Sequence, residues 1–444
     1  MFKTLKNAWR IPELKKKLLF TLLIVVLYRL GANIPVPYVD PAIFKEASAV
    51  AGGTILTFLN MLSGEALGKA TLLALGVSPY ITASIVIQLL TVAFPNSLGK
   101  WSKDGAEGRK KITALTRIVT VVLALVTAIG YAIYLKNGGT GTGTFLTVDE
   151  PTFFHYAVIV MCYCAGAALV MWMAEKINES GIGNGISIIL FANIIAGMFS
   201  MIGTLWYNVF PLGGFKGFQW VGLICSIASI IILLGMIMLI VWMSDAERRI
   251  PIQYAKRVVG RKMYGGQNTN LPLKVNMSGV MPIIFANSIV AILPTIASFM
   301  KPNGFTNFVN NWFNYNTWPY FGVFLVLLIA FAYFYVAISF NPVEVANNIK
   351  NNGGAIPGIR SGRPTVEFIK KVLNRITLVG ALLVAFIACF PMIVNNISVM
   401  FNFTGFAALA FGGSSMMIMV GVALETTREL EAQMTLRNYK GFLD

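Results

Sequence analysis

The feature that most constrains this chain is an apolar stretch from Thr54 to Phe94, which is too long for one membrane crossing. About 20 residues span the hydrocarbon core of a bilayer, so this stretch must be interrupted. Gly76, Ser78 and Pro79 mark the interruption, because a flexible residue, a helix-capping serine and a first-turn proline lie close together. The sequence therefore predicts a helix that starts at Ser78, with Ser78 as its N-cap.

The part before this break, residues 54–75, mixes apolar side chains with Asn60, Glu65, Lys69 and two glycines. A charged, glycine-interrupted segment can lie at membrane depth only where it is buried in protein or lines a water-filled cavity. This interpretation implies a hollow molecule. An interfacial helix followed by an ordinary span explains the local pattern equally well, so both interpretations remain open at this point.

The composition identifies the class of protein. Hydrophobic residues make up 56% of the 444 residues and charged residues only 12%, which excludes an ordinary soluble protein and indicates a polytopic membrane protein. A formal net charge of +17 could suggest nucleic-acid binding, but no interleaved soluble module is present to carry it. We therefore expect no sequence-specific nucleic acid among its partners.

The hydropathy pattern predicts an all-α fold with ten spans. These are expected at residues 18–34, 78–94, 117–135, 155–173, 186–204, 220–243, 276–298, 318–340, 376–396 and 404–424. An even number of spans places both termini on one side of the membrane. Most of the 35 Lys and Arg residues lie in segments on that side, so the positive-inside rule predicts cytoplasmic termini for a multi-pass protein.

This pattern divides the chain into four parts. They are a cytosolic N-terminal segment at 1–17, a first five-helix half at 18–204, a second half at 205–424 and a cytosolic C-terminal tail at 425–444. The second half contains two long basic loops, 244–274 and 341–375. Their length exceeds what a simple connection requires, so we expect them to bind something.

Each long loop contains a distinctive basic pattern. Residues 248–257 alternate in a way that predicts a protruding hairpin, whereas residues 357–362 form a turn that exposes Arg360. A basic loop tip suits an acidic protein, RNA phosphate or lipid headgroups, and the pattern does not separate these three.

Residues suited to catalysis or metal binding are scarce. Glu175 is the one acidic residue expected in a span, at its cytosolic end, so the charged kind of mid-membrane transport site is missing from the sequence. The sequence has no phosphate-binding glycine motif, and the single His155 is too little for the usual zinc or histidine-base chemistry. The four cysteines suit small apolar positions in the spans. We therefore expect no enzyme activity, no cofactor and no metal site.

Several long strings resemble the bacterial SecY family, the channel subunits of the Sec protein translocon. The strings are residues 76–90 (GVSPYITASIVIQLL), 181–187 (GIGNGIS), 248–251 (RRIP) with 254–257 (YAKR), 271–276 (LPLKVN) and 357–360 (PGIR). The resemblance extends from about residue 10 to 440. It implies two inverted five-helix halves around a central pore in the bacterial plasma membrane.

The resemblance also implies roles for particular residues. The half-helix before the second span would be a plug at about residues 57–69, which includes Leu59, Asn60, Met61, Leu62, Ser63 and Gly64. An aliphatic pore ring would consist of Val77, Ile81, Ile186, Leu190, Ile284 and Ile418. A hydrophobic constriction of this kind excludes water and so blocks ions, but it offers no strong binding site for a passing polypeptide. Valine at 77 and leucine at 190, where isoleucine is common, should leave the seal intact.

The same resemblance implies a lateral gate and docking surfaces. Gln88 and Asn287 would lie at the gate between the second and seventh spans, where a hydrogen bond could keep it shut, although a structural bond between packed helices is equally compatible. The basic residues expected to dock the SecA motor ATPase and the ribosome are Arg248, Arg249, Lys256, Arg257 and Arg360. Further expected partners are SecE and SecG type small subunits, signal-bearing preproteins and membrane lipids.

The expected function is a channel that translocates unfolded preproteins and releases transmembrane segments sideways into the membrane. A secondary transporter for a small solute is the first alternative, since ten spans and an inverted repeat allow it. A pore-less insertase or scaffold is the second. Neither alternative explains the strings quoted above.

Overall fold

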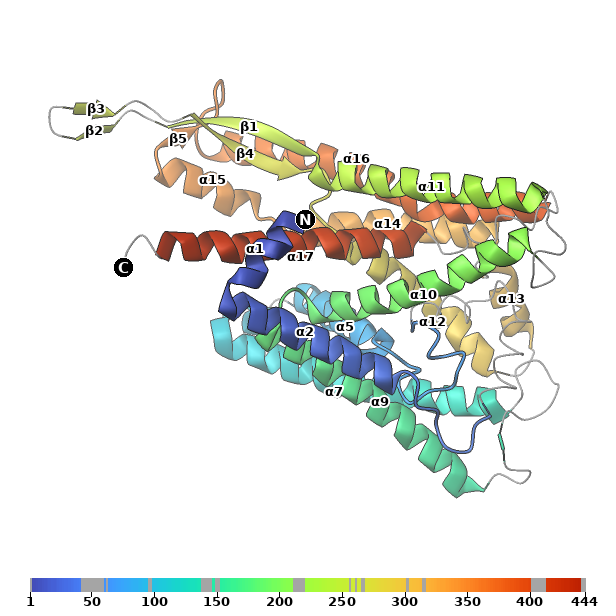
Figure 1. Cartoon of the computed structure of the whole chain (residues 1–444). Coiled ribbons are helices and arrows are strands. Elements are labelled where there is room, and N and C mark those ends of the chain that lie inside the picture. The colour runs from blue at the N-terminus through green and yellow to red at the C-terminus, as the bar shows by residue number, and fades with distance from the viewer. Residues whose placement is uncertain are drawn as a thin grey trace.

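The chain is largely helical and carries two small sheets at one end (Figure 1). Its architecture comes from a computed structural model. The structure describes residues 2–40, 60, 63–94, 98–136, 146–147, 152–210, 220–254, 257–259, 262–264, 268–300, 303–313, 317–400 and 413–440.

Each expected span falls on a helix, although part of the last span lies outside the described residues. The helices of the first half are α1 (Phe2–Arg10), α2 (Pro12–Gly31), α5 (Ser78–Ala93), α6 (Leu98–Lys103), α7 (Gly105–Lys136), α9 (Phe153–Ser180) and α10 (Gly185–Val209). Those of the second half are α11 (Trp220–Asp245), α12 (Met281–Phe299), α13 (Gly304–Trp312), α14 (Trp318–Ser339), α15 (Pro342–Asn351), α16 (Arg363–Met400) and α17 (Gly413–Lys440).

Five helical segments of the described chain are long and apolar enough to cross a membrane. They lie within α7, α9, α11, α14 with α15, and α16, while α5, α10 and α12 contribute shorter apolar stretches. The total of ten crossings therefore stays a prediction. Large apolar side chains such as Val126, Met238 and Phe386 are exposed on the outside of these helices, where a bilayer would cover them.

Several helices are longer than the hydropathy pattern predicts. The helix α7 starts at Gly105 rather than near residue 117, and α17 continues to Lys440, so the described part of the expected tail is helical. A polar helical turn at the end of a span lowers the mean hydropathy of the sequence there, but it does not end the helix. In α7 such a turn is stabilised by an ion pair of 3.0 Å between Lys111 Nζ and Glu107 Oε1.

The start of α5 confirms the predicted break, with one correction. The helix begins at Ser78 with Pro79 in its first turn, but Val77 is the N-cap residue and no side chain caps the helix. Gly76 directly precedes the N-cap residue Val77 and adopts φ +54°. This left-handed conformation, which glycine adopts readily, redirects the chain into the helix.

The predicted hairpin in the first long loop is confirmed. Strand β1 (Glu247–Tyr254) pairs antiparallel with β4 (Asn268–Lys274), and β2 (Arg257–Val259) pairs with β3 (Lys262–Tyr264). The second loop contributes β5 (Gly354–Ala355) to the free side of β1, so the larger sheet has the order β4-β1-β5. The two long loops therefore form one structure, which the sequence pattern did not predict.

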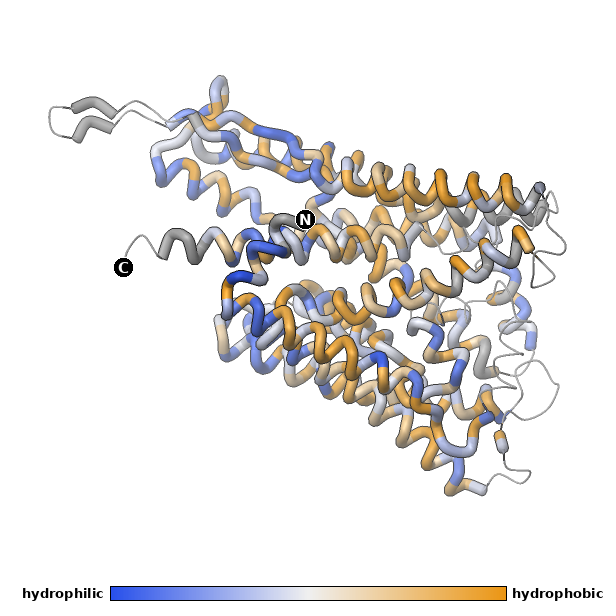
Figure 2. Tube along the Cα trace, in the orientation of Figure 1, coloured by the Kyte–Doolittle hydropathy of each residue, from blue (hydrophilic) through white to orange (hydrophobic). Residues whose placement is uncertain are grey.

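The helix α1 and the C-terminal part of α17 lie at the end of the bundle that carries this sheet, which we name the sheet end (Figure 1). The helices α1 and α17 are in contact there. Figure 2 shows hydrophobic residues along the bundle and hydrophilic residues gathered at the sheet end. This arrangement agrees with an even number of spans and with basic loops on one side.

Candidate functional site

One large apolar cluster, which we name the central cluster, occupies the middle of the bundle. It contains side chains from α2, α5, α9, α10, α11, α12, α14, α16 and α17, and so from both halves of the chain. Contacts of α10 with both α11 and α17 also join the halves. The cluster is the place where the two halves close against each other.

All six expected ring residues belong to or pack against the central cluster. Five of them are buried, with exposures between 1% and 7%, and they are Val77, Ile81, Leu190, Ile284 and Ile418. Ile186 is partly buried and packs against the cluster. Burial of each aliphatic side chain contributes roughly 1.5–3 kcal/mol and leaves no polar group to bind an ion. Their role as a pore ring stays a prediction.

The helices α5 and α12 begin in the same way. Each follows a glycine with positive φ (Gly76 at +54° and Gly279 at +62°), has a valine as its N-cap and carries a proline in its first turn. The repeat places Ile81 and Ile284 at equivalent positions. The strings GVSPYI and GVMPII carry this signal in the sequence and could have revealed the internal repeat.

The expected half-helix at 57–69 is only partly correct within the described residues. Asn60 is helical, whereas residues 63–70 form turns; Leu59, Met61 and Leu62 lie outside the described residues. Gly64, Glu65 and Ala70 adopt positive φ values of 66°, 69° and 47°, which a right-handed helix does not allow.

Local hydrogen bonds hold these turns together. The Asn60 side-chain Oδ1 accepts from the Gly68 backbone N–H at 2.6 Å, and Ser63 Oγ accepts from the Leu67 N–H at 3.1 Å. Polar residues that looked unsuited to a membrane segment therefore satisfy the backbone of an irregular one. For the described part of the segment, residues 60 and 63–75, this agrees with the interpretation that it is buried in protein or lines a cavity.

The same turns are anchored to the rest of the first half. The Leu67 carbonyl accepts a hydrogen bond of 3.0 Å from the Tyr131 hydroxyl of α7, and the Leu72 N–H donates to the Ile34 carbonyl at 2.8 Å. Gly166 of α9 allows a further close approach, because a Cβ there would clash with the Leu72 carbonyl oxygen. Residues 63–72 are thus held in place by contacts with α7, α9 and the backbone of Ile34.

Gln88 and Asn287 lie on helices that are in contact, α5 and α12, but they do not bond each other. Gln88 is exposed and its Nε2 donates to Ser84 Oγ at 3.3 Å within α5. Asn287 is buried, and neither its Nδ2 nor its Oδ1 has a partner among the described residues. The expected hydrogen bond between them is therefore wrong, because Gln88 Nε2 donates within its own helix and Asn287 bonds to no described residue.

The expected docking residues lie at the sheet end. Arg248 is exposed on β1, whereas Arg249 pairs with Glu247 at 2.6 Å. Arg360 is exposed in a turn between Gly358 and Gly362, both with positive φ. Lys256 lies outside the described residues. Arg257 belongs to β2, and its side chain lies outside the described set.

A second cluster, which we name the sheet cluster, joins the two long loops. Its buried members are Ile250, Ile252, Leu273, Ala346, Ile349, Ile356 and Ile369. They come from β1, β4, α15, the β5 region and the start of α16. The loops therefore fold as one unit with its own core, and this unit carries both Arg248 and Arg360.

Charged residues connect this unit to α17. Arg428 Nη2 donates to Asp245 Oδ1 at 2.6 Å and to the Ser244 carbonyl at 2.9 Å, at the base of β1. Partial burial lowers the pKa of Lys274, and the nearby Arg428 charge lowers it further.

In the first half of the chain, Arg117 of α7 pairs with Glu175 of α9 through two contacts of 2.9 and 2.8 Å. This ion pair balances the charge of the one carboxylate that the sequence places in a span.

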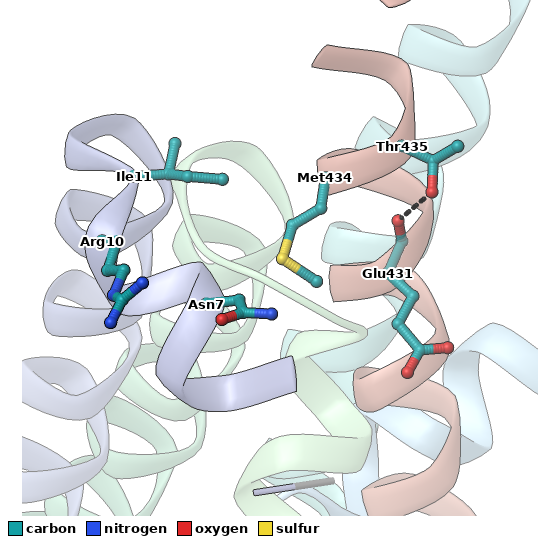
Figure 3. Close-up of a pocket in the computed structure, with 6 residues that line it drawn as sticks. All are labelled: Asn7, Arg10, Ile11, Glu431, Met434 and Thr435. Carbon is teal, nitrogen blue, oxygen red and sulfur yellow. Dashed lines mark hydrogen bonds between the residues drawn. The ribbon is translucent and has the colours of Figure 1, made fainter. Parts of the chain in front are cut away.

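An open groove of about 400 Å³ is lined by residues of α1 and α17 at the sheet end, beside the contact between these helices (Figure 3). Its lining residues are Asn7, Arg10, Ile11, Glu431, Met434 and Thr435. Figure 3 shows Met434 reaching from α17 toward α1, and Thr435 donating to the Glu431 carbonyl at 2.8 Å. The groove lies where the two terminal helices meet and contains none of the residues expected for a channel.

Comparison with solved structures finds the same fold in protein-conducting channels. A structure described as that of a protein conducting channel covers 95% of this chain and 92% of its own, with a TM-score of 0.63 and 18% identity. A structure that concerns the SecY plug domain and the closed translocation channel has a TM-score of 0.62, 19% identity and the same coverage. A canine ribosome-channel complex from the endoplasmic reticulum has a TM-score of 0.60, 16% identity and again the same coverage.

Sequence comparison finds relatives with a higher identity than these structures have. The SecY family profile matches residues 71–427. The protein translocase subunit SecY of Streptomyces coelicolor is 42% identical over 455 residues and 100% of both chains, and that of Bacillus licheniformis is 38% identical over 444 residues with the same coverage. The profile match and these full-length relatives show that this chain belongs to the SecY family.

Proposed function

We propose that this chain is the protein-conducting channel of a bacterial Sec translocon. It translocates unfolded preproteins across the plasma membrane and releases transmembrane segments sideways into the lipid. The single observation that carries this proposal is that six aliphatic residues, contributed by both halves, lie in or against the central cluster where the halves meet. A purely aliphatic closure blocks ions yet offers no strong site that would hold a passing chain.

The pore ring consists of the six aliphatic residues already named, and the plug consists of residues 57–69. The support for the plug is the buried, irregular segment 63–70, which lies directly before the break at Gly76. The seam between α5 and α12 acts as the lateral gate. Because Asn287 is buried without a described partner, the closed seam includes a polar group that costs about 1–3 kcal/mol, which favours opening.

The sheet end faces the cytoplasm, and both termini lie there. This orientation is supported by the basic residues of the two long loops and the positive-inside rule. The exposed Arg360 and Arg248 provide a docking surface for the SecA motor ATPase and for the ribosome. SecE and SecG type subunits complete the assembly. The chain itself performs no chemistry, since the motor or the ribosome supplies the energy.

The deciding experiment measures protease protection of a preprotein in liposomes. The vesicles contain this chain and a SecE-type subunit, and SecA and ATP are added. We expect the preprotein to become protected only when it carries an intact signal sequence. If no protection appears although both subunits have assembled, the channel assignment fails, and uptake of small solutes becomes the assay for the transporter alternative.

A further inference from the structure

Arg29 lies near the C-terminal end of α2 and connects three segments through its guanidinium group. Its Nη1 donates to the Gly64 carbonyl oxygen at 3.3 Å. Its Nη2 donates to the carbonyl oxygens of Ala192 at 2.6 Å and Asn193 at 3.3 Å. Ala192 and Asn193 belong to α10, whereas Gly64 belongs to the proposed plug, so one side chain joins α2, α10 and the plug.

The surroundings of Arg29 are shaped for this contact. The neighbouring Tyr28 is buried, and its hydroxyl accepts a hydrogen bond of 2.9 Å from Asn193 Nδ2, which fixes α2 against α10. Gly64 adopts φ +66°, and a Cβ at this position would lie 2.8 Å from both Nη1 and Nη2 of Arg29. Glycine is therefore favoured at position 64, because a side chain there would strain the backbone and displace the Arg29 guanidinium.

The acceptors of Arg29 are backbone carbonyls. Among the described residues, no carboxylate forms an ion pair with it, and the nearby Glu65 pairs instead with Lys69 at 3.9 Å. Carbonyl oxygens cannot follow a moving guanidinium as a flexible carboxylate can. If Gly64 moves away from α10, the arginine loses an acceptor within a partly buried site, where lost hydrogen bonds to charged groups are expensive.

We propose that Arg29 is a positioning residue that holds the plug in the sealed arrangement, because it binds the Gly64 carbonyl and the α10 backbone at the same time. This inference rests on the proposed function, since it assumes that residues 57–69 seal the channel. The seal then depends on a polar anchor as well as on aliphatic packing. The Tyr131 bond to Leu67 provides a second anchor, so loss of Arg29 loosens the plug without detaching it.

The test measures the resting ion conductance of channels reconstituted with a SecE-type subunit in planar bilayers. Arg29→Met keeps an apolar stem and removes every donor. Gly64→Ala keeps Arg29 but places a methyl group against it. We expect both variants to raise the resting conductance at least about tenfold, which corresponds to about 1.4 kcal/mol. Arg29→Lys should give a smaller rise, because one ammonium group is a poor replacement for the guanidinium fork.

Gly105→Ala is the matched control. Gly105 has the same φ of +66° as Gly64, but no atom lies within 4 Å of the position that a Cβ would take there. The control therefore introduces similar backbone strain without touching Arg29. We expect wild-type resting conductance from this variant, and a rise equal to that of Gly64→Ala would overturn the proposal.

Preprotein translocation in matching vesicles separates this inference from the proposed function. A looser plug should leave signal-dependent translocation at or above the wild-type rate, whereas misfolding would lower it. Wild-type conductance of both Arg29→Met and Gly64→Ala, with normal translocation, overturns the role of Arg29 and leaves the channel function intact. If Arg29→Met fails to assemble, Gly64→Ala alone decides. Failure of the wild-type chain to translocate overturns the function itself.

Discussion

The central cluster and the sheet cluster are both built from buried apolar residues, but the central cluster combines both halves of the chain and the sheet cluster only one. The central cluster combines residues from both halves, such as Ile81 and Ile284. The sheet cluster combines Ile252, Ile349 and Ile369, which all belong to the second half. Similar side chains with similar burial therefore hold together two different kinds of unit.

The two clusters are therefore expected to support different properties, namely closure of the channel and docking of partners at the sheet end. A change in the central cluster alters the contact between the halves, and so the closed state of the channel. A change in the sheet cluster alters only the support of the exposed basic residues at the sheet end. Variants of the same residue type in the two clusters can test whether the two properties are independent.

The largest effect is expected from combining Ile81→Gly with Ile284→Gly. Each substitution empties part of the central cluster and costs about 2–5 kcal/mol, to which glycine inside a helix adds about 1 kcal/mol. We expect the resting channel to leak ions in planar bilayers while subunit assembly is retained. Unchanged conductance of an assembled channel would count against the pore ring.

The matching change in the sheet cluster is Ile252→Ala. Ile252 is 4% exposed, close to the 6% of Ile284, so the loss of packing should again be about 2–5 kcal/mol. We expect faster proteolysis within loop 244–274 and slower SecA-driven export, with wild-type resting conductance. A leak from this variant would break the comparison, because the two clusters would then be coupled.

A surface change tests docking without disturbing either cluster. Arg360→Glu reverses an exposed charge, so stability should change by no more than about 0.5 kcal/mol. We expect SecA-driven export to fall about tenfold, equivalent to about 1.4 kcal/mol of lost binding. Lys350→Glu, an exposed basic residue of α15 in the same unit, is the control and should export normally. Normal export by Arg360→Glu would falsify the docking assignment.

The smallest effect is expected from Leu190→Ile in the central cluster. This swap conserves volume, so it should cost less than about 1.5 kcal/mol and leave the resting conductance unchanged. Leu190→Ala is the matched variant that leaves a cavity, and it should both lower stability and raise the conductance. Equal conductance from the two variants would show that packing at this position does not contribute to the seal.

The apolar parts of the long helices, the break before α5 and the hairpin of the first loop could all be predicted from the sequence. These features depend on interactions between residues that are close along the chain. Apolar runs define spans, Gly76 and Pro79 end one segment and start another, and alternation of side chains defines strands. The family strings added the identities of the ring residues, which hydropathy cannot distinguish from residues that face lipid.

Other features depend on which distant residues become neighbours. The pairing of β5 with β1, the carbonyl partners of Arg29 and the partnerless amide of Asn287 among the described residues each follow from how helices and loops pack. Local competition also matters, since Gln88 bonds to Ser84 one turn away. Hydropathy and turn chemistry are properties of single segments, whereas the choice of a hydrogen-bond partner is a property of the packed molecule. That is why the spans were predictable and the contacts that hold the plug and the docking surface were not.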